Sequence, residues 1–422
     1  MKKIIAMLLA CMMVIGMFAA CGGSETAETK PQAAAPAENA GPEAITLKVW
    51  APQADQVDET CWLPVMLAKF EEAHPEYTIT WDIGVCGEGD AAGIVKNDPA
   101  AAADVFLYAN DQMGTLIEAG ALAKLGGSYL EQVQNDVAQT YIDTVTYTDG
   151  GVYGFPMAPN TWFMWYNKDV FTEEDVKSLN TMLEKGVVSF PMDNSWYTAT
   201  FFFGVGGTCF GPQGIDAAAG IDFGSDLCVE AAKFMIDFAK SPNFVNDVDG
   251  TGVAGMKEGT ISAMFSGPWD RPALEESLGD KLGCAVLPTF TLADGNTYQM
   301  KSFAGSKAIG VNPNAKFPKA AMQLAAFLAS AEGQLARYEL SAITPAATAC
   351  AEDEAVKSNF VVVTESAEMA TATVAQPTIA EMASYWDPVK NFGTNILNGT
   401  ITYENAAEMI AATMELLNNS GL

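Results

Sequence analysis

Histidine, the most frequent general acid or base in enzymes, occurs once in this sequence, at His74. A serine or cysteine nucleophile activated by histidine is therefore nearly excluded, because His74 follows a helical stretch where a capping or solvent-facing role is expected. The sequence has no GxxxxGK[ST] motif and no CxxC pair. Asp247-Val248-Asp249-Gly250 lacks the other ligands and the distal glutamate of a calcium loop. We therefore expect no metal ion and no cofactor.

Carboxylates are abundant, with 52 acidic against 22 basic residues and a formal net charge of -30. A pair of carboxylates that hydrolyses a glycosidic bond is therefore the main enzymatic alternative. The acidic residues are spread along the chain, however, and no pair stands out, so an enzyme is not expected. The same charge repels a phosphate backbone and excludes nucleic acid as a partner.

Aromatic residues beside predicted strand ends could recognise a ligand without catalysis. Trp269 follows Gly267-Pro268 at the end of a predicted strand over residues 261–265, and the proline fixes the turn that presents the indole. Tyr108 ends a predicted strand over 103–108, and Asp111 lies in the loop that follows. Sugars have apolar ring faces and a rim of hydroxyls, so stacked aromatic rings and polar side chains would bind one.

The elements that must position these residues alternate between strands and helices. Residues 45–50 and 77–83 alternate as strands do, and residues 62–72 and 113–119 carry helical apolar stripes. Further along, strands are predicted at 162–167, 187–190, 261–265, 283–288 and 308–311, and helices at 198–205, 226–240, 318–330 and 332–340. Residues 367–419 are predicted to be mainly helical. This order predicts α/β layers around a mostly parallel sheet.

The first residues resemble an export signal. Met1-Lys2-Lys3 precedes an apolar run from Ile4 to Ala20, which is at the short end for a membrane span, so a cleaved signal peptide over 1–20 is favoured. Phe18-Ala19-Ala20-Cys21-Gly22 resembles the bacterial lipobox, which implies lipidation of Cys21 and anchoring on the extracellular face of the cell membrane. Residues 21–44 predict a flexible tether. The folded remainder suits two domains.

Six cysteines lie beyond this region: Cys61, Cys86, Cys209, Cys228, Cys284 and Cys350. An exported chain with six cysteines can hold up to three disulfides. Buried free thiols are an equal alternative, and the sequence leaves both open. With one histidine in the chain, these cysteines give little support to a metal site.

Five segments in order resemble the family of extracellular solute-binding proteins typified by maltose-binding protein. Gly151-Val152-Tyr153-Gly154-Phe155-Pro156 precedes Tyr166-Asn167-Lys168, as at the family's first crossover between domains. The other segments are 256–269 (MKEGTISAMFSGPW), Val286-Leu287-Pro288-Thr289-Phe290, Ala331-Glu332-Gly333-Gln334 and Thr344-Pro345-Ala346. The resemblance covers about residues 45 to 422.

The resemblance implies a periplasmic-binding-protein-like α/β fold. Lobe 1 would comprise residues 45–157 plus 305–355, and lobe 2 residues 158–304 plus 356–422, joined by a hinge of crossing strands with the ligand in the cleft between them. The resemblance implies a monomer that captures an oligosaccharide of the maltodextrin type and delivers it to the permease subunits of an ABC importer. A binding protein for another sugar, a peptide or a polyamine is the alternative.

The same resemblance assigns site residues. Tyr108 and Asp111 match an aromatic and a carboxylate of the first lobe, and Trp196 and Trp386 match stacking aromatics. Amides replace acidic groups at Asn160 and Asn194, and Gln112 replaces an arginine beside Asp111. An amide serves a hydroxyl rim as donor and acceptor, so sugar is still expected, whereas maltose in particular is left open. Gln53 and Asp55, near the first strand, are further rim candidates.

Overall fold

The computed structural model describes residues 41–419. The predicted signal peptide 1–20, the lipidation site Cys21 and the predicted tether up to residue 40 lie outside the described residues. The first strand, β1 (Glu43–Ala51), begins two residues earlier than expected and includes the last two residues of the predicted tether. Across residues 41–419, no helix is both long enough and apolar enough to cross a bilayer.

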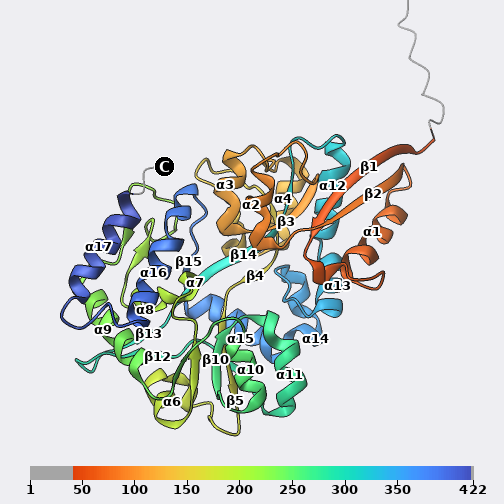
Figure 1. The fold of residues 1–422 in the computed structure, drawn as a ribbon. Coiled ribbons are helices and arrows are strands. Elements are labelled where there is room, and N and C mark those ends of the chain that lie inside the picture. The colour runs from red at the N-terminus through yellow and green to blue at the C-terminus, as the bar shows by residue number, and fades with distance from the viewer. Residues whose placement is uncertain (1–40, 420–422) are drawn as a thin grey trace, which may run out of the picture. The chain divides into compact units, whose positions relative to one another are not determined.

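The first sheet joins segments from distant parts of the chain (Figure 1). Its order is β15 (Thr373–Ala375), β14 (Ser302–Val311), β3 (Val105–Ala109), β1 and β2 (Tyr77–Val85), and β4 (Phe155–Asn160) also pairs with β14. Strand β1 runs parallel to β2 and β3, whereas β14 is antiparallel to β3 and β4. The sheet is therefore mixed: the strands predicted at residues 45–50, 77–83 and 103–108 pair in parallel, as does β14 with β15, and the antiparallel pairings are those of β14 with β3 and β4.

Helices from two parts of the chain pack around this sheet because their apolar residues recur every three or four positions. In α1 (Trp62–Ala73) the buried stripe includes Trp62, Met66 and Phe70, and His74 ends the helix as its C-cap residue. The other helices are α2 (Ala91–Val95), α3 (Met113–Glu118), α4 (Gly127–Asp136), α5 (Gln139–Thr144), α12 (Pro318–Leu328) and α13 (Ala331–Ser341). The predicted helices at 62–72 and 113–119 are thus confirmed.

The second sheet has the order β11 (Leu282–Ala285), β5 (Phe163–Asn167), β10 (Ala263–Ser266), β6 (Val188–Phe190) and β9 (Phe244–Asn246). Its main helices are α6 (Leu179–Lys185), α7 (Ser195–Thr198), α8 (Thr200–Gly204), α9 (Asp226–Lys240), α10 (Thr251–Glu258) and α11 (Arg271–Leu278). The C-terminal helices are α14 (Glu354–Lys357), α15 (Phe360–Thr371), α16 (Trp386–Leu397) and α17 (Ala406–Asn419). Two small ribbons, β7 (Thr208–Cys209) with β8 (Ile221–Asp222) and β12 (Thr289–Thr291) with β13 (Thr297–Gln299), complete the strands.

The two sheets have separate hydrophobic cores, and this separation defines two lobes. Strand β14 crosses between them, because Phe303 packs in the core of the second sheet whereas Ile309 packs in the core of the first. The chain crosses again between Ala158, in the first core, and Trp162, in the second. The crossings lie between residues 158 and 162 and between residues 303 and 309, and the boundaries at 157/158 and 304/305 stay predictions. The fold is the two-lobed α/β arrangement expected from the sequence.

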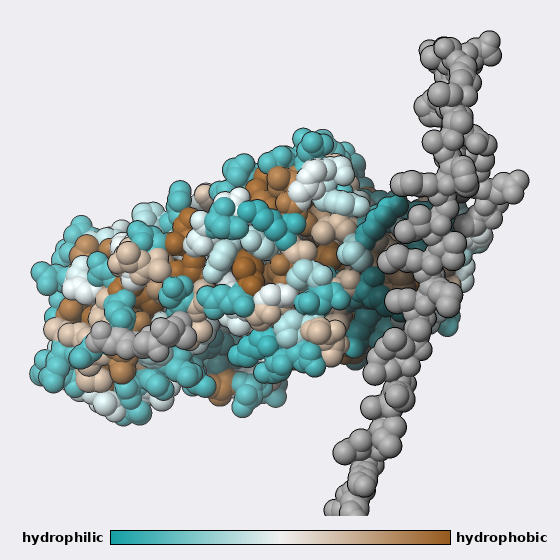
Figure 2. All heavy atoms as spheres, turned by 90° about the horizontal axis from the view of Figure 1, so that it is seen from above, coloured by the Kyte–Doolittle hydropathy of each residue, from teal (hydrophilic) through white to brown (hydrophobic). Residues whose placement is uncertain are grey.

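The six cysteines beyond residue 40 are all free thiols. Four of them, Cys86, Cys209, Cys228 and Cys350, are buried. Of the two alternatives that the sequence left open, the structure therefore has free thiols. On the face seen in Figure 2, hydrophilic residues predominate and apolar ones appear in separate small areas, in keeping with acidic residues spread along the chain.

Candidate ligand-binding cleft

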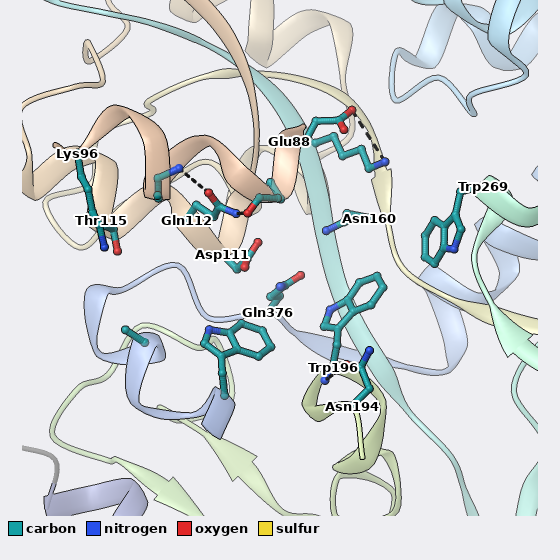
Figure 3. Close-up of a pocket in the computed structure, with 17 residues that line it drawn as sticks. Glu88, Lys96, Asp111, Gln112, Thr115, Asn160, Asn194, Trp196, Trp269 and Gln376 are labelled. Carbon is teal, nitrogen blue, oxygen red and sulfur yellow. Dashed lines mark hydrogen bonds and ion pairs between the residues drawn. The ribbon is translucent and has the colours of Figure 1, made fainter. Parts of the chain in front are cut away.

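A cavity of about 810 Å³ lies between elements of the two lobes (Figure 3). Its first-lobe wall comes from η2 (Glu88–Asp90), α2, η3 (Asn110–Gln112), α3 and the crossing strands β4 and β14. Its second-lobe wall comes from α7, the turn after β10, the end of β15 and the start of α16. The lining side chains that matter below are Glu88, Lys96, Asp111, Gln112, Thr115, Asn160, Asn194, Trp196, Trp269, Lys307, Gln376 and Trp386.

Two indoles form an aromatic wall of this cavity. The ring centroids of Trp196 and Trp269 are 5.8 Å apart, with the ring planes inclined by 33°. Trp196 is positioned by Asn194, which caps α7 by accepting a hydrogen bond on Oδ1 from the Trp196 backbone N–H (3.1 Å). Trp269 is 43% exposed, which is a large exposure for a tryptophan side chain.

Glycine at position 267 allows the Trp269 ring to fold back over its own turn. A Cβ added at Gly267 would lie 1.9 Å from a ring atom of Trp269, so any side chain there would displace the indole. Trp165 fixes the same turn, because its indole N–H donates to the Gly267 carbonyl at 3.1 Å. The predicted role of the Gly267-Pro268 turn in presenting the indole therefore has a local structural basis.

A third indole, Trp386, lines the cavity from the first residue of α16. It packs edge-on against Tyr385, with ring centroids 5.1 Å apart and an interplanar angle of 89°. The Tyr385 hydroxyl donates to the Ser195 carbonyl (2.9 Å), which joins the start of α16 to α7. Trp386 and Trp196 thus sit on elements that are tied to each other.

Polar groups face these indoles. Asp111 lies in η3, directly after β3, and no side chain within residues 41–419 donates a hydrogen bond to its carboxylate. Burial raises the pKa of Asp111 to about 6, although the backbone N–H of the same residue opposes the change. Asn160 ends β4 on the cavity wall, and its amide hydrogen-bonds no other described residue. These groups are available to sugar hydroxyls.

An ion network closes the first-lobe side of the cavity. Glu88 accepts a hydrogen bond from Arg337 (2.9 Å) and lies 3.9 Å from the Lys307 ammonium. Burial alone would raise the pKa of Glu88, but Lys307 and Arg337 outweigh it, and the pKa is lower than the usual value. Arg337 also binds Asp55 at 2.7 Å. Glu88 and Lys307 are therefore charged lining groups held in place by buried partners.

Three residues expected to bind ligand do not line the cavity. Tyr108 has 0% exposure in the core of the first sheet, and its hydroxyl points to the Tyr153 carbonyl (3.4 Å). The side chains of a strand alternate between its faces, and that of Tyr108 lies in the core. Asp55 is buried in its ion pair with Arg337. Gln53 is exposed outside the cavity. These three assignments are corrected.

The other predicted residues do line one cavity: Asp111, Asn160, Asn194, Trp196, Trp269 and Trp386. Gln112 also lines it, but its amide is held by the Ala92 N–H (2.6 Å) and the Gly89 carbonyl, so it orders the wall. The sequence analysis missed Glu88, Lys96, Thr115, Lys307 and Gln376. For Lys307 a signal existed, since a lysine within an apolar strand needs a polar surface or a partner.

This cleft has aromatic rings on one side and polar groups on the other, and the described residues contain no cluster of three or more potential metal ligands. Such a cleft between two α/β lobes defines a binding protein for a small solute. The chain belongs to the family of bacterial extracellular solute-binding proteins, whose model matches residues 65–362.

Relatives with assigned roles are moderately similar in sequence. The galactooligosaccharide-binding protein of Bacillus subtilis is 28% identical over 333 residues, which cover 74% of this chain and 76% of the relative. The maltooligosaccharide ABC transporter solute-binding lipoprotein of Streptococcus pneumoniae is 28% identical over 346 residues, 76% of this chain and 78% of the relative.

Two solved structures resemble this chain over most of its length. One, determined with acarbose, is 42% identical with a TM-score of 0.84 and covers 90% of this chain and 100% of its own. The maltodextrin-binding protein MalE1 of L. casei, solved without ligand, is 25% identical with a TM-score of 0.82 and covers 89% of this chain and 100% of its own. Both support the two-lobed fold.

Proposed function

We propose that this chain captures an oligosaccharide of the maltodextrin type outside the cell and delivers it to the permease subunits of an ABC importer. The observation that carries the proposal is the set of three indoles around one cavity, with Trp196 and Trp269 only 5.8 Å apart. Indoles stack on the apolar faces of sugar rings, and the opposite wall offers carboxylate, ammonium and amide groups to the hydroxyls. The cavity volume, about 810 Å³, lies in the upper part of the range of small-molecule sites, roughly 300–1,000 Å³.

Three of the similar proteins support an oligosaccharide as the ligand. The acarbose complex shares 42% of its residues with this chain, and acarbose is an oligosaccharide-like compound. The B. subtilis relative is named for galactooligosaccharides and the S. pneumoniae relative for maltooligosaccharides. An experiment must therefore decide which sugar units and which glycosidic linkage the cleft prefers.

The proposal includes a lipid anchor at Cys21, a monomeric protein and no catalytic turnover. A retaining or inverting glycosidase requires one carboxylic acid and one carboxylate, both free to act on the sugar. Asp111 is free, but Glu88 is bound to Arg337 and lies beside Lys307. This binding of Glu88 disfavours the glycosidase alternative.

A calorimetric titration of the purified chain against maltotriose, maltotetraose and a galactotriose tests the ligand. We expect saturable binding of the maltodextrins, and the ratio of affinities gives the linkage preference. Prolonged incubation with maltotetraose, read for new reducing ends, tests turnover. The proposed function would be refuted if none of the three sugars binds. Release of new reducing ends would instead indicate that the protein is a glycosidase.

A further inference from the structure

Gln376 lies beside the strand that crosses between the lobes and lines two cavities. It directly follows β15, and its backbone N–H donates to the carbonyl of Ala304 on the crossing strand β14 (3.2 Å). Pro377 comes next and restricts the backbone of Gln376 to extended conformations. The side chain lines the sugar cleft and also a second cavity of about 400 Å³, lined among others by Tyr141, Gln213 and Met369.

The side-chain amide of Gln376 lacks partners within the protein. Its residue is only 4% exposed, and its Oε1 is buried without a hydrogen-bond partner among the described residues. Its Nε2 likewise donates to no group in the described chain. Buried polar atoms are nearly always hydrogen-bonded. Because the Oε1 is closed off beside β14, the Nε2 is the part of the amide that a ligand in the cleft would complete.

The surroundings of Gln376 hold the amide in place. A Cβ at Gly305 would lie 2.2 Å from Gln376 Oε1 and 2.6 Å from Asn110 Oδ1, so both side chains close over this glycine of β14. Asn110 in turn accepts a hydrogen bond from the Ser306 N–H (2.9 Å), and its own Nδ2 is buried without a partner. The amide of Gln376 therefore cannot move closer to β14.

Figure 3 shows Gln376 between Asp111 on the first-lobe side and Trp196 on the second-lobe side. A hydroxyl oxygen accepts hydrogen bonds, and the unpaired Nε2 of Gln376 is a donor. We propose that Gln376 binds one hydroxyl of the oligosaccharide and makes the cleft selective for sugars that carry this hydroxyl.

Such a contact acts as a specificity determinant. A buried polar group that is paired only by the ligand penalises any analogue without the pairing hydroxyl, because the amide then stays unpaired in the complex. Apolar stacking on Trp196 or Trp269 tolerates loss of a hydroxyl far better. The inference rests on the proposed function, since it names one contact of the same sugar site.

The test compares two matched substitutions by calorimetric titration with maltotriose. Gln376→Met removes the amide at similar side-chain length, and Gln213→Met makes the same change in the second cavity, outside the cleft. We expect Gln376→Met to weaken binding by about 3- to 10-fold, the effect of one hydrogen bond. Gln213→Met should leave the affinity unchanged.

A set of monodeoxy maltotrioses then separates a direct contact from a structural role. One analogue should bind the natural protein as weakly as maltotriose binds Gln376→Met, and should lose nothing further in that variant. The apo melting temperature of Gln376→Met should equal or exceed that of the natural protein, because an unpaired buried oxygen is removed. If Gln376→Met does not fold, Gln376→Ala takes its place in the same titrations.

Several results would overturn the inference. Unchanged maltotriose affinity in Gln376→Met would do so, as would an equal loss in Gln213→Met, which would place the effect behind the cleft. Identical deoxy-sugar profiles in the natural protein and in Gln376→Met would also contradict a direct contact. If the natural protein binds no oligosaccharide, the proposed function itself fails. The first titration separates this outcome from a failure of the Gln376 contact, because the natural protein then shows no binding.

Discussion

The indole rings of Trp196 and Trp269 lie 5.8 Å apart, inclined at 33°, although the two residues are 73 positions apart in the chain. Trp196 is placed by a helix cap and Trp269 by a turn that requires glycine at position 267. Trp196 is half-buried against the second core and Trp269 is exposed, and together they offer an apolar surface to one face of a sugar. This pair is the basis of the first prediction.

Trp269→Ala should remove most of the sugar affinity and little of the stability. A central aromatic contact typically contributes about 2 kcal/mol or more to binding, about a 30-fold loss. At a ligand concentration a hundred times the natural Kd, the stabilisation by ligand should fall from about 2.7 to about 0.9 kcal/mol. The apo melting temperature should barely change, since the ring is 43% exposed.

Trp81→Ala is the matched control for this experiment, because Trp81 lies on β2 and does not line the cleft. Thermal shift with maltotriose measures both variants. An undiminished ligand shift in Trp269→Ala would remove the stacking role of this indole, whereas a diminished shift in Trp81→Ala would show that the assay reports general damage.

Sugar affinity should depend on pH through Asp111. The pKa of this carboxyl is raised to about 6 by burial, and the ionised form is the stronger acceptor for a sugar hydroxyl. The affinity should therefore be fully present above pH 7 and fall as the pH drops through 6, by about tenfold at pH 5 if only the ionised form binds. Calorimetric titration across pH 5 to 8 measures the effect.

Asp111→Asn supplies the control, because an amide does not titrate in this range. We expect its affinity to be lower than that of the natural protein at pH 7.5 and flat across the whole series. A pH dependence that persists in Asp111→Asn would assign the titration to another group.

Tyr108→Phe should leave sugar affinity unchanged within about twofold. The ring is buried in the first core, and the hydroxyl reaches only the Tyr153 carbonyl, at 3.4 Å. Removal of such a long hydrogen bond should cost about 1 kcal/mol of folding stability or less. Urea denaturation and maltotriose titration measure the two quantities. A tenfold loss of affinity would restore Tyr108 to the binding site, contrary to its position in the structure.

Arg337→Met should destabilise the first lobe, because it leaves two acidic partners, Asp55 and Glu88, without their buried cation. Breaking a buried ion pair from one side typically costs about 3–5 kcal/mol. Lys177→Met, which breaks a solvent-exposed pair with Glu174, should cost little or no stability. Urea denaturation of the two variants measures the difference, and equal costs would mean that the buried network adds no stability.

The elements of this fold were largely predictable because their apolar patterns are local. The stripe at Trp62, Met66 and Phe70 forms one face of α1, and the alternation at residues 77–83 gives β2. Strand β14 was predicted only in its last four residues, 308–311, because its earlier part lies at the lobe crossing, where Lys307 and Gly305 interrupt the apolar pattern.

Which residues line the cavity was predictable where local turns and caps position them. The segment that ends in Trp269 and the residues around Trp196 and Trp386 carry their own turns and caps, and all three indoles line the cavity. Asp55 failed for the opposite reason. The Asp55 carboxylate is buried in an ion pair with Arg337, 282 positions away, and the sequence around Asp55 does not reveal this partner.

The sequence by itself therefore determined the α/β elements, the family and the aromatic segments, because these follow from local periodicity and from motifs in order. Only the tertiary structure decided which side chains share the cavity. It turned Tyr108 into the core, paired Asp55 with Arg337, and brought Glu88, Lys307 and Gln376 to the cleft. Packing and charge pairing between distant segments set these positions, and no single segment encodes them alone.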